Sequence, residues 1–213
     1  MENETFQTVC KKGQGNSIGT LLRQIAYNSI SCWRPIGYEI DRKSTSILHT
    51  EGDVVQDMIE FAFNLAQLQF EANEEIATDF LKEQYTFRGV LNSSEMQSGN
   101  KLNCITNNQE VLNVIGNGEL TILVYFRKTS GVHSVDSNVN FLTSKGTNID
   151  NIKVMASTHS VINTFTFGVE EHNLDEELLK LNVSSKSINA KAVVLESAKV
   201  VMGSLNDLIS NLH

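Results

Sequence analysis

The sequence is poor in several residues and patterns that mark particular protein classes. Its 213 residues include only three cysteines and one proline. Cys10, Cys32 and Cys104 are far apart, and none has a second Cys or His at ligand spacing. We therefore expect reduced thiols rather than a disulfide framework or a zinc knuckle. No apolar run approaches the roughly 20 residues of a membrane-spanning helix, so we expect no membrane association.

Basic residues are also few. The chain has 17 Lys and Arg against 25 Asp and Glu, which gives a formal net charge of −8. Affinity for nucleic acid needs clustered positive charge. The densest basic groups in this sequence are pairs, such as Lys11-Lys12, Arg42-Lys43 and Arg127-Lys128. We therefore expect little or no direct contact with DNA.

No set of residues indicates catalysis or metal binding. The five histidines lack the H-x-x-x-H and H-E-x-x-H spacings of metal sites. His159 lies beside Ser157 and Ser160, but no G-x-S-x-G sequence accompanies them, so polar loop residues are the better interpretation. The acidic residues between 170 and 177 are interpreted as a solvated surface. We predict no catalytic residue and no metal ligand.

The sequence does contain an amphipathic helix near each end. Over residues 17–30, apolar side chains recur at the i, i+3, i+4, i+7 spacing of one helical face. From about Asn189 to Leu212 they recur at alternating spacings of four and three. Faces of this kind must be buried against the rest of the chain or against a second copy. Their members are Ile18, Leu21, Leu22, Ile25 and Ala26 in the first helix, and Val194, Ala198, Val201, Leu205, Leu208 and Leu212 in the last.

The segments between these helices are mostly typical of strands. A further helix is expected over residues 54–68, with Asp53 as its N-cap. Alternation of apolar and polar residues predicts strands over 5–10, 36–40, 47–49, 161–169 and 178–183.

The middle of the chain has one strong turn signal. The sequence Gly116-Asn117-Gly118 separates two apolar runs, 111–115 and 120–126, and Asn-Gly favours a type I′ turn. We therefore predict a hairpin formed by these two runs. Residues 130–150 are expected to form a polar loop, and residues 71–110 show little pattern.

A glycine pattern at the start of the first helix suggests one enzymatic alternative. Gly13, Gly15 and Gly19 follow a predicted strand and open a helix, and Glu39 or Asp41 ends the next strand. This imitates a dinucleotide-binding fingerprint, although the spacing is one residue too long and no doubly wound alternation follows. A small homodimeric nucleotide-binding enzyme is the competing hypothesis, and it predicts nucleotide affinity in the isolated chain.

Several segments resemble one known family, in that family's order. The run from Gly15 to Ile25, GNSIGTLLRQI, followed by Tyr38-Glu-Ile-Asp41, resembles the amino-terminal domain of the RNA polymerase alpha subunit. The resemblance continues at 50–57, at Asn64-Leu65, at 165–169, at 178–188 and through the last helix. Residues 71–150 are barely matched.

The resemblance implies an α+β fold, an RNA polymerase alpha-like dimerisation domain with an inserted, mostly β second lobe. Residues 1–41 and 157–213 would form a discontinuous dimerisation subdomain, and residues 42–156 the inserted one. It implies a non-catalytic subunit of a multisubunit DNA-directed RNA polymerase, whose dimer is the assembly platform for the beta- and beta-prime-type subunits in transcription. No cofactor is expected in this subunit, and the catalytic magnesium is expected in the beta-prime-type partner.

The resemblance also assigns residues to two interfaces. A homodimer interface would use both terminal helices, through Ile18, Leu21, Leu22, Ile25, Val194, Ala198, Val201, Leu205 and Leu208. Contacts to the large subunits would use Arg23 and Asp57 on the beta side, and Leu178, Val183 and Ile188 on the beta-prime side.

The cellular location is a further expectation. The N-terminal residues show no signal or transit pattern, and the chain ends without the family's DNA-binding domain. These features lead us to expect the plastid stroma or nucleoid, with the bacterial cytoplasm as the alternative. A generic interaction module with a helical dimer interface remains open, because only its partner would distinguish it.

Overall fold

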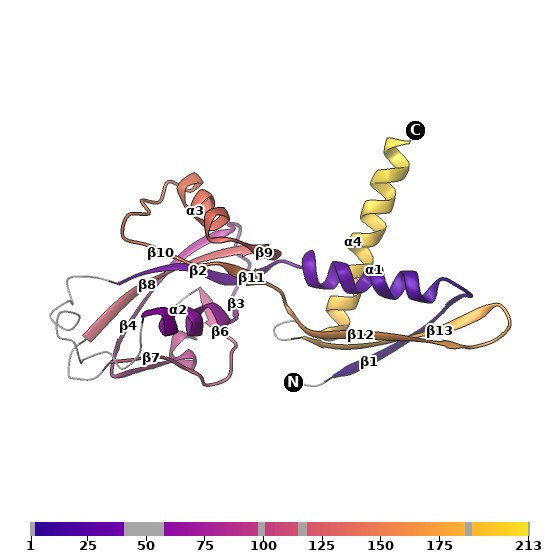
Figure 1. The fold of residues 1–213 in the computed structure, drawn as a ribbon, viewed down its shortest axis with the longest axis horizontal. Coiled ribbons are helices and arrows are strands. Elements are labelled where there is room, and N and C mark those ends of the chain that lie inside the picture. The colour runs from indigo at the N-terminus through magenta and orange to yellow at the C-terminus, as the bar shows by residue number, and fades with distance from the viewer. Residues whose placement is uncertain (1–2, 41–57, 98–100, 115–118, 186–188, 213) are drawn as a thin grey trace. The chain divides into compact units, whose positions relative to one another are not determined.

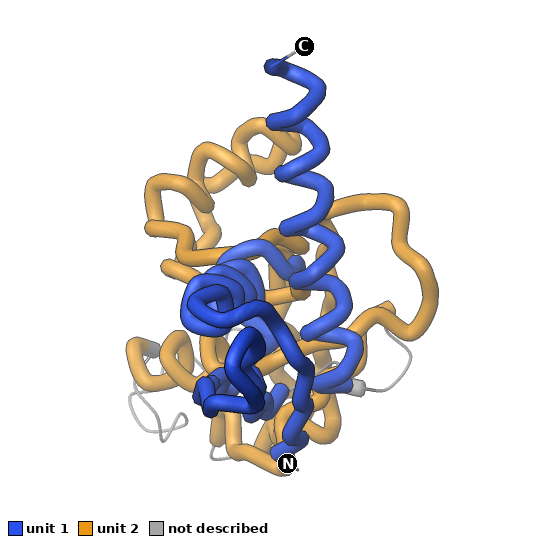
Figure 2. Tube along the Cα trace, turned by 90° about the vertical axis from the view of Figure 1, so that its right-hand side faces the viewer, with its two compact units in different colours: residues 1–31, 160–213 blue, residues 32–159 orange. Residues whose placement is uncertain are grey.

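The computed structural model describes residues 3–40, 58–97, 101–114, 119–185 and 189–212. The chain divides into two compact units, one of residues 1–31 and 160–213 and the other of residues 32–159 (Figure 2). The second unit therefore begins at Cys32, ten residues before the expected boundary at 42. The reason is the strand β2 (Cys32–Ile40), whose hydrogen-bonded neighbours β8 (Glu119–Thr129) and β10 (Lys153–Val154) belong to the second unit.

Unit 1 is a small antiparallel sheet covered by two helices. Its strand order is β1-β13-β12, and both strand pairs are antiparallel. The helix α1 packs on β12 and β13, and α4 packs on β13 and β1 and against α1 (Figure 1). These elements confirm the strands and helices predicted near both ends. Their bounds are β1 (Glu4–Lys11), α1 (Gly15–Asn28), β12 (Ile162–Glu171), β13 (Glu176–Ser185) and α4 (Ala190–Asn211).

The core of unit 1 follows from the period of two along its strands. Phe6, Leu181 and Phe167 stand opposite one another on the three strands, on the face that α1 covers. The same alternation turns Asn182 and its neighbours Thr5 and Thr166 to the uncovered face. Only the first half of α4 contributes buried residues, and its second half extends away from the sheet of this unit (Figure 1).

Unit 2 is built on a larger sheet, whose described strand pairs are all antiparallel. Its strand order is β4-β8-β2-β3-β6. The short strand β10 also pairs with β2, at Gly37 and Tyr38. Two small ribbons, β11-β9 and β5-β7, complete the unit. The bounds are α2 (Met58–Gln67), β3 (Phe70–Ala72), β4 (Phe80–Arg88), β5 (Val90–Asn92), the 3-10 helix η2 (Ser93–Gln97), β6 (Leu102–Cys104), β7 (Glu110–Asn113), β8 (Glu119–Thr129), β9 (Gly131–His133), α3 (Val135–Ser144), β10 (Lys153–Val154) and β11 (Ser157–His159).

The main core of unit 2 lies between this sheet and α2. Tyr38 and Phe61 meet edge-to-face at 4.6 Å, and so do Phe70 and Phe126. Such aromatic pairs add directional preference to the burial of apolar area. A second, smaller core contains Leu142 of α3 and covers the other side of β2 and β8.

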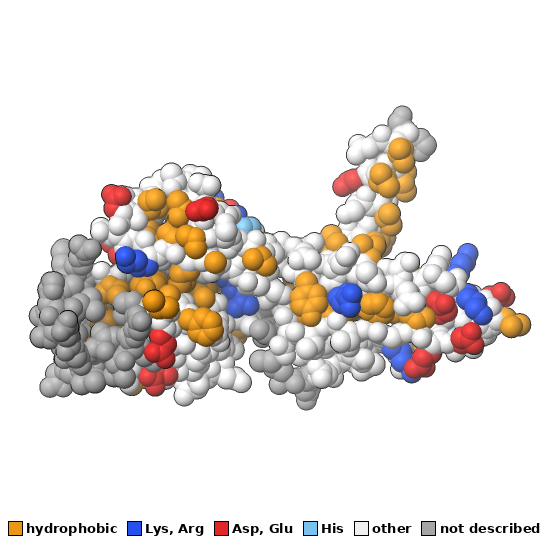
Figure 3. Space-filling model, in the orientation of Figure 1, with side chains coloured by type: hydrophobic (Ala, Val, Ile, Leu, Met, Phe, Trp, Pro, Cys, Tyr) orange, Lys and Arg blue, Asp and Glu red, His pale blue; other side chains and the backbone are white. Residues whose placement is uncertain are grey.

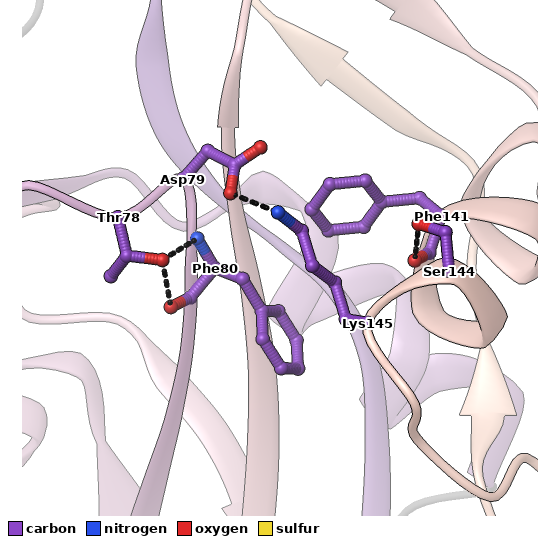
Figure 4. Close-up of polar contacts among 6 residues, drawn as sticks. All are labelled: Thr78, Asp79, Phe80, Phe141, Ser144 and Lys145. Carbon is purple, nitrogen blue, oxygen red and sulfur yellow. Dashed lines mark hydrogen bonds and ion pairs between the residues drawn. The ribbon is translucent and has the colours of Figure 1, made fainter.

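An ion pair joins α3 to the edge of this sheet (Figure 4). Lys145 Nζ lies 2.6 Å from Asp79 Oδ1, and this hydrogen bond lowers the pKa of the Asp79 carboxyl. The ring of Phe141 packs edge-to-face on Phe80 and lies under the guanidinium of Arg127, 4.3 Å from its centroid. The α3 helix is thus tied to β4 and β8 by both apolar and charged contacts.

Two predictions for the middle of the chain are wrong. The runs 111–115 and 120–126 do not pair with each other, because β7 pairs with β5 and both edges of β8 are taken by β2 and β4. The turn between them lies outside the described residues. Residues 130–150 are not a plain loop, since α3 begins there, with the Ser134 hydroxyl accepting a hydrogen bond from the Ser137 amide as an N-cap.

Other predictions are confirmed in part. The strand β2 begins at Cys32 rather than at Ile36 and passes through Pro35 at an irregularity in its pairing with β8. The expected strand at 47–49 and the start of the helix near Asp53 lie outside the described residues. The mixture of helices and antiparallel sheets confirms the α+β class. Among the described helices, none combines the length and the apolar character needed to cross a membrane.

Candidate protein-interaction surfaces

The outer side of α1 and α4 carries an apolar face, which we name the α1–α4 face. It consists of side chains that are exposed or half-buried in the single chain. On α4 these include Leu205 and Leu208, which are 52% and 55% exposed, and Met202, which is 63% exposed. Figure 3 shows hydrophobic side chains along the extended part of α4. The members are Ile18, Leu21 and Ile25 of α1, and Val194, Ala198, Val201, Met202, Leu205, Leu208, Ile209 and Leu212 of α4.

Most of the residues assigned to the dimer interface belong to this face. Leu22 differs, because it lies on the buried side of α1. Met202, Ile209 and Leu212 were not among the assigned interface residues, although Met202 and Ile209 lie seven residues apart beside the apolar stripe of α4 and Leu212 is the last member of that stripe. Their exposure now adds them to the surface.

A carboxylate from β13 occupies the N-terminus of α1. The amides of Gly13 and Gly15 donate hydrogen bonds to the two oxygens of Glu177, at 2.8 and 3.0 Å. These bonds lower the pKa of the Glu177 carboxyl. Amides at a helix N-terminus could bind a phosphate, as the nucleotide hypothesis requires, but here the chain's own carboxylate binds them.

The other glycine of the pattern has a packing role. A Cβ at Gly19 would lie 2.4 Å from a ring carbon of Phe167, so only glycine lets α1 approach β12 this closely. At the far end of α1, the Tyr27 hydroxyl accepts a hydrogen bond from the Phe165 amide at 3.1 Å. These contacts attach α1 to the sheet. They explain the glycines at positions 15 and 19 without requiring a bound ligand.

The residues assigned to large-subunit contacts fall on different surfaces of unit 1. Arg23 is exposed on α1, with its guanidinium 5.5 Å from the Phe167 ring centroid. Leu178 is half-buried on the uncovered face of the sheet, opposite Val9 of β1. Val183 has 0% exposure and points to the covered face, so its side chain offers no surface to a partner.

The remaining two assigned residues, Asp57 and Ile188, lie outside the described residues. Sequence reasoning missed Val9, which is exposed next to Leu178. Alternation along β1 could have identified it, since Val9 is out of phase with Phe6, Thr8 and Cys10.

A buried polar chain in unit 2 contains the Ser157 and His159 pair. His159 Nδ1 donates to the Cys32 carbonyl at 3.1 Å, because a carbonyl can only accept. His159 Nε2 therefore accepts from the Ser157 hydroxyl at 2.9 Å, and Asn138 Nδ2 donates to that hydroxyl at 3.0 Å. Burial lowers the pKa of His159 to about 4, so the ring is neutral near neutral pH.

This arrangement has the hydrogen bonds of a serine nucleophile and its base, but not the access. His159 is 0% exposed and Ser157 is buried as well. A substrate could not reach the hydroxyl without opening the ribbon β11-β9, so the chain of hydrogen bonds is a structural element. Within the described ranges, no group of three or more His, Cys, Asp or Glu side chains could hold a metal ion.

In sequence the chain is similar to an RNA polymerase subunit. No family model matches the chain. Over 217 aligned residues it is 24% identical to a protein of a Mycoplasma species named DNA-directed RNA polymerase subunit alpha. The resemblance to RNA polymerase alpha subunits is confirmed. The match covers 95% of this chain and 61% of that relative, so the chain spans about three-fifths of the relative's length.

Proposed function

We propose that this alpha-type chain is a non-catalytic subunit of a multisubunit DNA-directed RNA polymerase and that it dimerises through the α1–α4 face. The observation that carries the proposal is the exposed apolar side of α4. The relative's name supports the polymerase, and its bacterial source favours the bacterial cytoplasm over a plastid.

The size of the α4 contribution can be estimated. Leu205 and Leu208 each leave about half of their side-chain surface exposed in the single chain. Burying half of a leucine gains about 1 kcal/mol, given about 2 kcal/mol for a whole side chain. In a two-fold symmetric interface each residue contributes twice, so these two leucines alone would supply about 4 kcal/mol. The flanking Met202, Ile209 and Leu212 would add to this.

The dimer is tested by Leu205→Asp, which places a charge in the middle of the face. Burying two unpaired carboxylates costs several kcal/mol, so the variant should sediment as a monomer at concentrations where the wild type is a dimer. Ser210→Asp is the matched control, because it adds the same charge to the opposite side of α4 and should leave the dimer intact. An unchanged oligomer in Leu205→Asp would refute the interface.

The dimer would be the platform for the beta- and beta-prime-type subunits. Arg23, exposed on α1, is suited to a partner's carboxylate or backbone carbonyls, because its planar guanidinium donates several hydrogen bonds in fixed directions. The uncovered sheet face around Leu178 and Val9 would face the beta-prime-type subunit. The catalytic magnesium would belong to that partner, and no cofactor to this chain.

This second step is tested by a pull-down of the large subunits with Arg23→Ala. Recovery of the beta-type subunit should fall, whereas the control Lys199→Ala, which removes a positive charge from α4, should recover it fully. Equal recovery with both variants would overturn the role of Arg23. Mass spectrometry of the captured proteins also tests the general interaction module, since partners other than polymerase subunits would favour that alternative.

The nucleotide-binding enzyme is not favoured by the geometry. The backbone amides that would bind a nucleotide phosphate are those of Gly13 and Gly15, and both already donate hydrogen bonds to Glu177. Titration of the isolated chain with nucleotides should show no binding.

A further inference from the structure

The first turn of α1 is held by a residue that the interface assignments do not include. Glu177 lies on β13, and its two carboxylate oxygens each accept one amide hydrogen, from Gly13 and from Gly15. No side-chain cap comes from Gln14, the N-cap residue of α1. The Gly15 amide of the first helical turn and the Gly13 amide just before it are therefore bound from a strand more than 160 residues away in the sequence.

Close packing shows that the carboxylate and the helix fit each other. A Cβ at Gly15 would lie 2.9 Å from Glu177 Oε2 and 2.8 Å from Val169. The backbone of α1 thus rests directly on the Glu177 carboxylate and on β12. With Tyr27 bound to the Phe165 amide at the other end, α1 is attached to the sheet at both of its ends.

The α1 members of the α1–α4 face lie between these two attachments. Ile18 is in the first turn after Gly15, and Leu21 and Ile25 follow on the same side. If the first turn loosens, Ile18 and Leu21 lose their fixed direction. The loss would then appear in association, because a disordered turn must be ordered again when two chains meet.

We propose that Glu177 is a positioning residue of the dimer interface, which holds the first turn of α1 in the orientation that the second copy binds. This inference rests on the proposed dimer. A carboxylate suits the role because it accepts two hydrogen bonds at once and carries negative charge to the positive end of the helix dipole.

The experiment compares Glu177→Ala, Glu177→Gln and the control Glu171→Gln by sedimentation over a range of concentrations. Glu171 is a carboxylate near the same turn, paired with Lys12 at 3.6 Å, and it does not touch the glycine amides. Loss of a helix cap corresponds to roughly tenfold in an equilibrium constant, so Glu177→Ala should raise the dissociation constant of the dimer by up to about tenfold. Glu177→Gln keeps one acceptor oxygen and should fall between Ala and wild type. Glu171→Gln should match the wild type.

Hydrogen exchange provides the second readout. In Glu177→Ala, the amides of residues 13–18 should exchange faster, whereas those around Tyr27 should not change. A general loss of stability would instead speed exchange throughout unit 1.

The outcomes separate this inference from the proposed function. A wild-type chain that stays monomeric would refute the dimer itself. A wild-type dimer with an unchanged dissociation constant in Glu177→Ala would refute the role of Glu177 alone. An equal effect of Glu171→Gln would also refute it, because the effect would then be one of net charge.

Discussion

Replacing Gly19 by alanine tests how closely α1 must approach the sheet. The new methyl carbon would lie 2.4 Å from Phe167 Cδ2 and 2.7 Å from Phe167 Cγ. Rotation of the ring about its own axis cannot relieve the contact with Cγ, because that atom lies on the axis. Either Phe167 must change its first side-chain torsion, or α1 must move away from β12.

Two effects of opposite sign decide the result. Alanine in a helix is favoured over glycine by about 1 kcal/mol. Forcing an extra carbon into a packed contact costs about 1–3 kcal/mol. We therefore expect Gly19→Ala to lower the free energy of unfolding by about 1 kcal/mol, taking the middle of that range.

Gly203 in α4 offers a matched control, because a Cβ there meets nothing within 4 Å. Gly203→Ala gains helix propensity without a clash and should raise stability by about 1 kcal/mol. Both variants should be measured by urea unfolding at one protein concentration, since the stability of a dimer depends on concentration. If Gly19→Ala were as stable as Gly203→Ala, the close contact between α1 and β12 would not exist in solution.

Two further predictions concern acid and DNA. The pKa of His159 is about 4 in the fold against 6.5 for the free side chain, so the unfolded chain binds a proton first as the pH falls. The contribution of the neutral His159 to the free energy of unfolding should therefore be fully present well above pH 6.5, and about 2 kcal/mol of it should be lost by pH 5. In urea unfolding, His159→Asn should lose this part of the pH dependence, and an unchanged pH slope would contradict the argument. Gel-shift titration of the chain with duplex DNA should show no complex at physiological salt, because its net charge is −8. Tight binding with steep salt dependence would reveal a basic face that the sequence conceals.

Unit 1 could be predicted well from the sequence because its elements are locally encoded. Alternation in β12 and β13 and the heptad-like spacing in α4 each follow from one face being buried and the other not. The α4 pattern also continues past the residues that the single chain buries, and this excess is what pointed to a second copy.

Unit 2 was harder to predict for physical reasons. Its central strand β8 is flanked on both edges and covered on both faces, so its sequence is apolar without a clear period. The Asn117-Gly118 signal favoured a local hairpin, but pairing with the distant β2 and β4 took both edges of β8. The helix α3 was missed although Ser134 is a good N-cap, because its apolar residues are few.

The Ser157 and His159 pair shows a different limit. The two residues are close in the sequence, and the structure does join them by a hydrogen bond. Whether such a pair is reactive depends on access, which the surrounding ribbon and Asn138 of α3 determine. Access is a property of the whole unit, so no local motif could have decided it.

The glycines at the start of α1 make the same point about binding. A phosphate and a carboxylate both need free amides, and both need a residue without a side chain where they approach the backbone. The pattern of Gly13 and Gly15 is therefore compatible with either, and local sequence cannot choose between a nucleotide site and an internal contact. The choice is made by Glu177, 162 positions after Gly15, because β13 brings its carboxylate to the helix end. The feature that resembled an enzyme's binding loop thereby becomes part of the support for the surface that we propose binds a second copy of the chain.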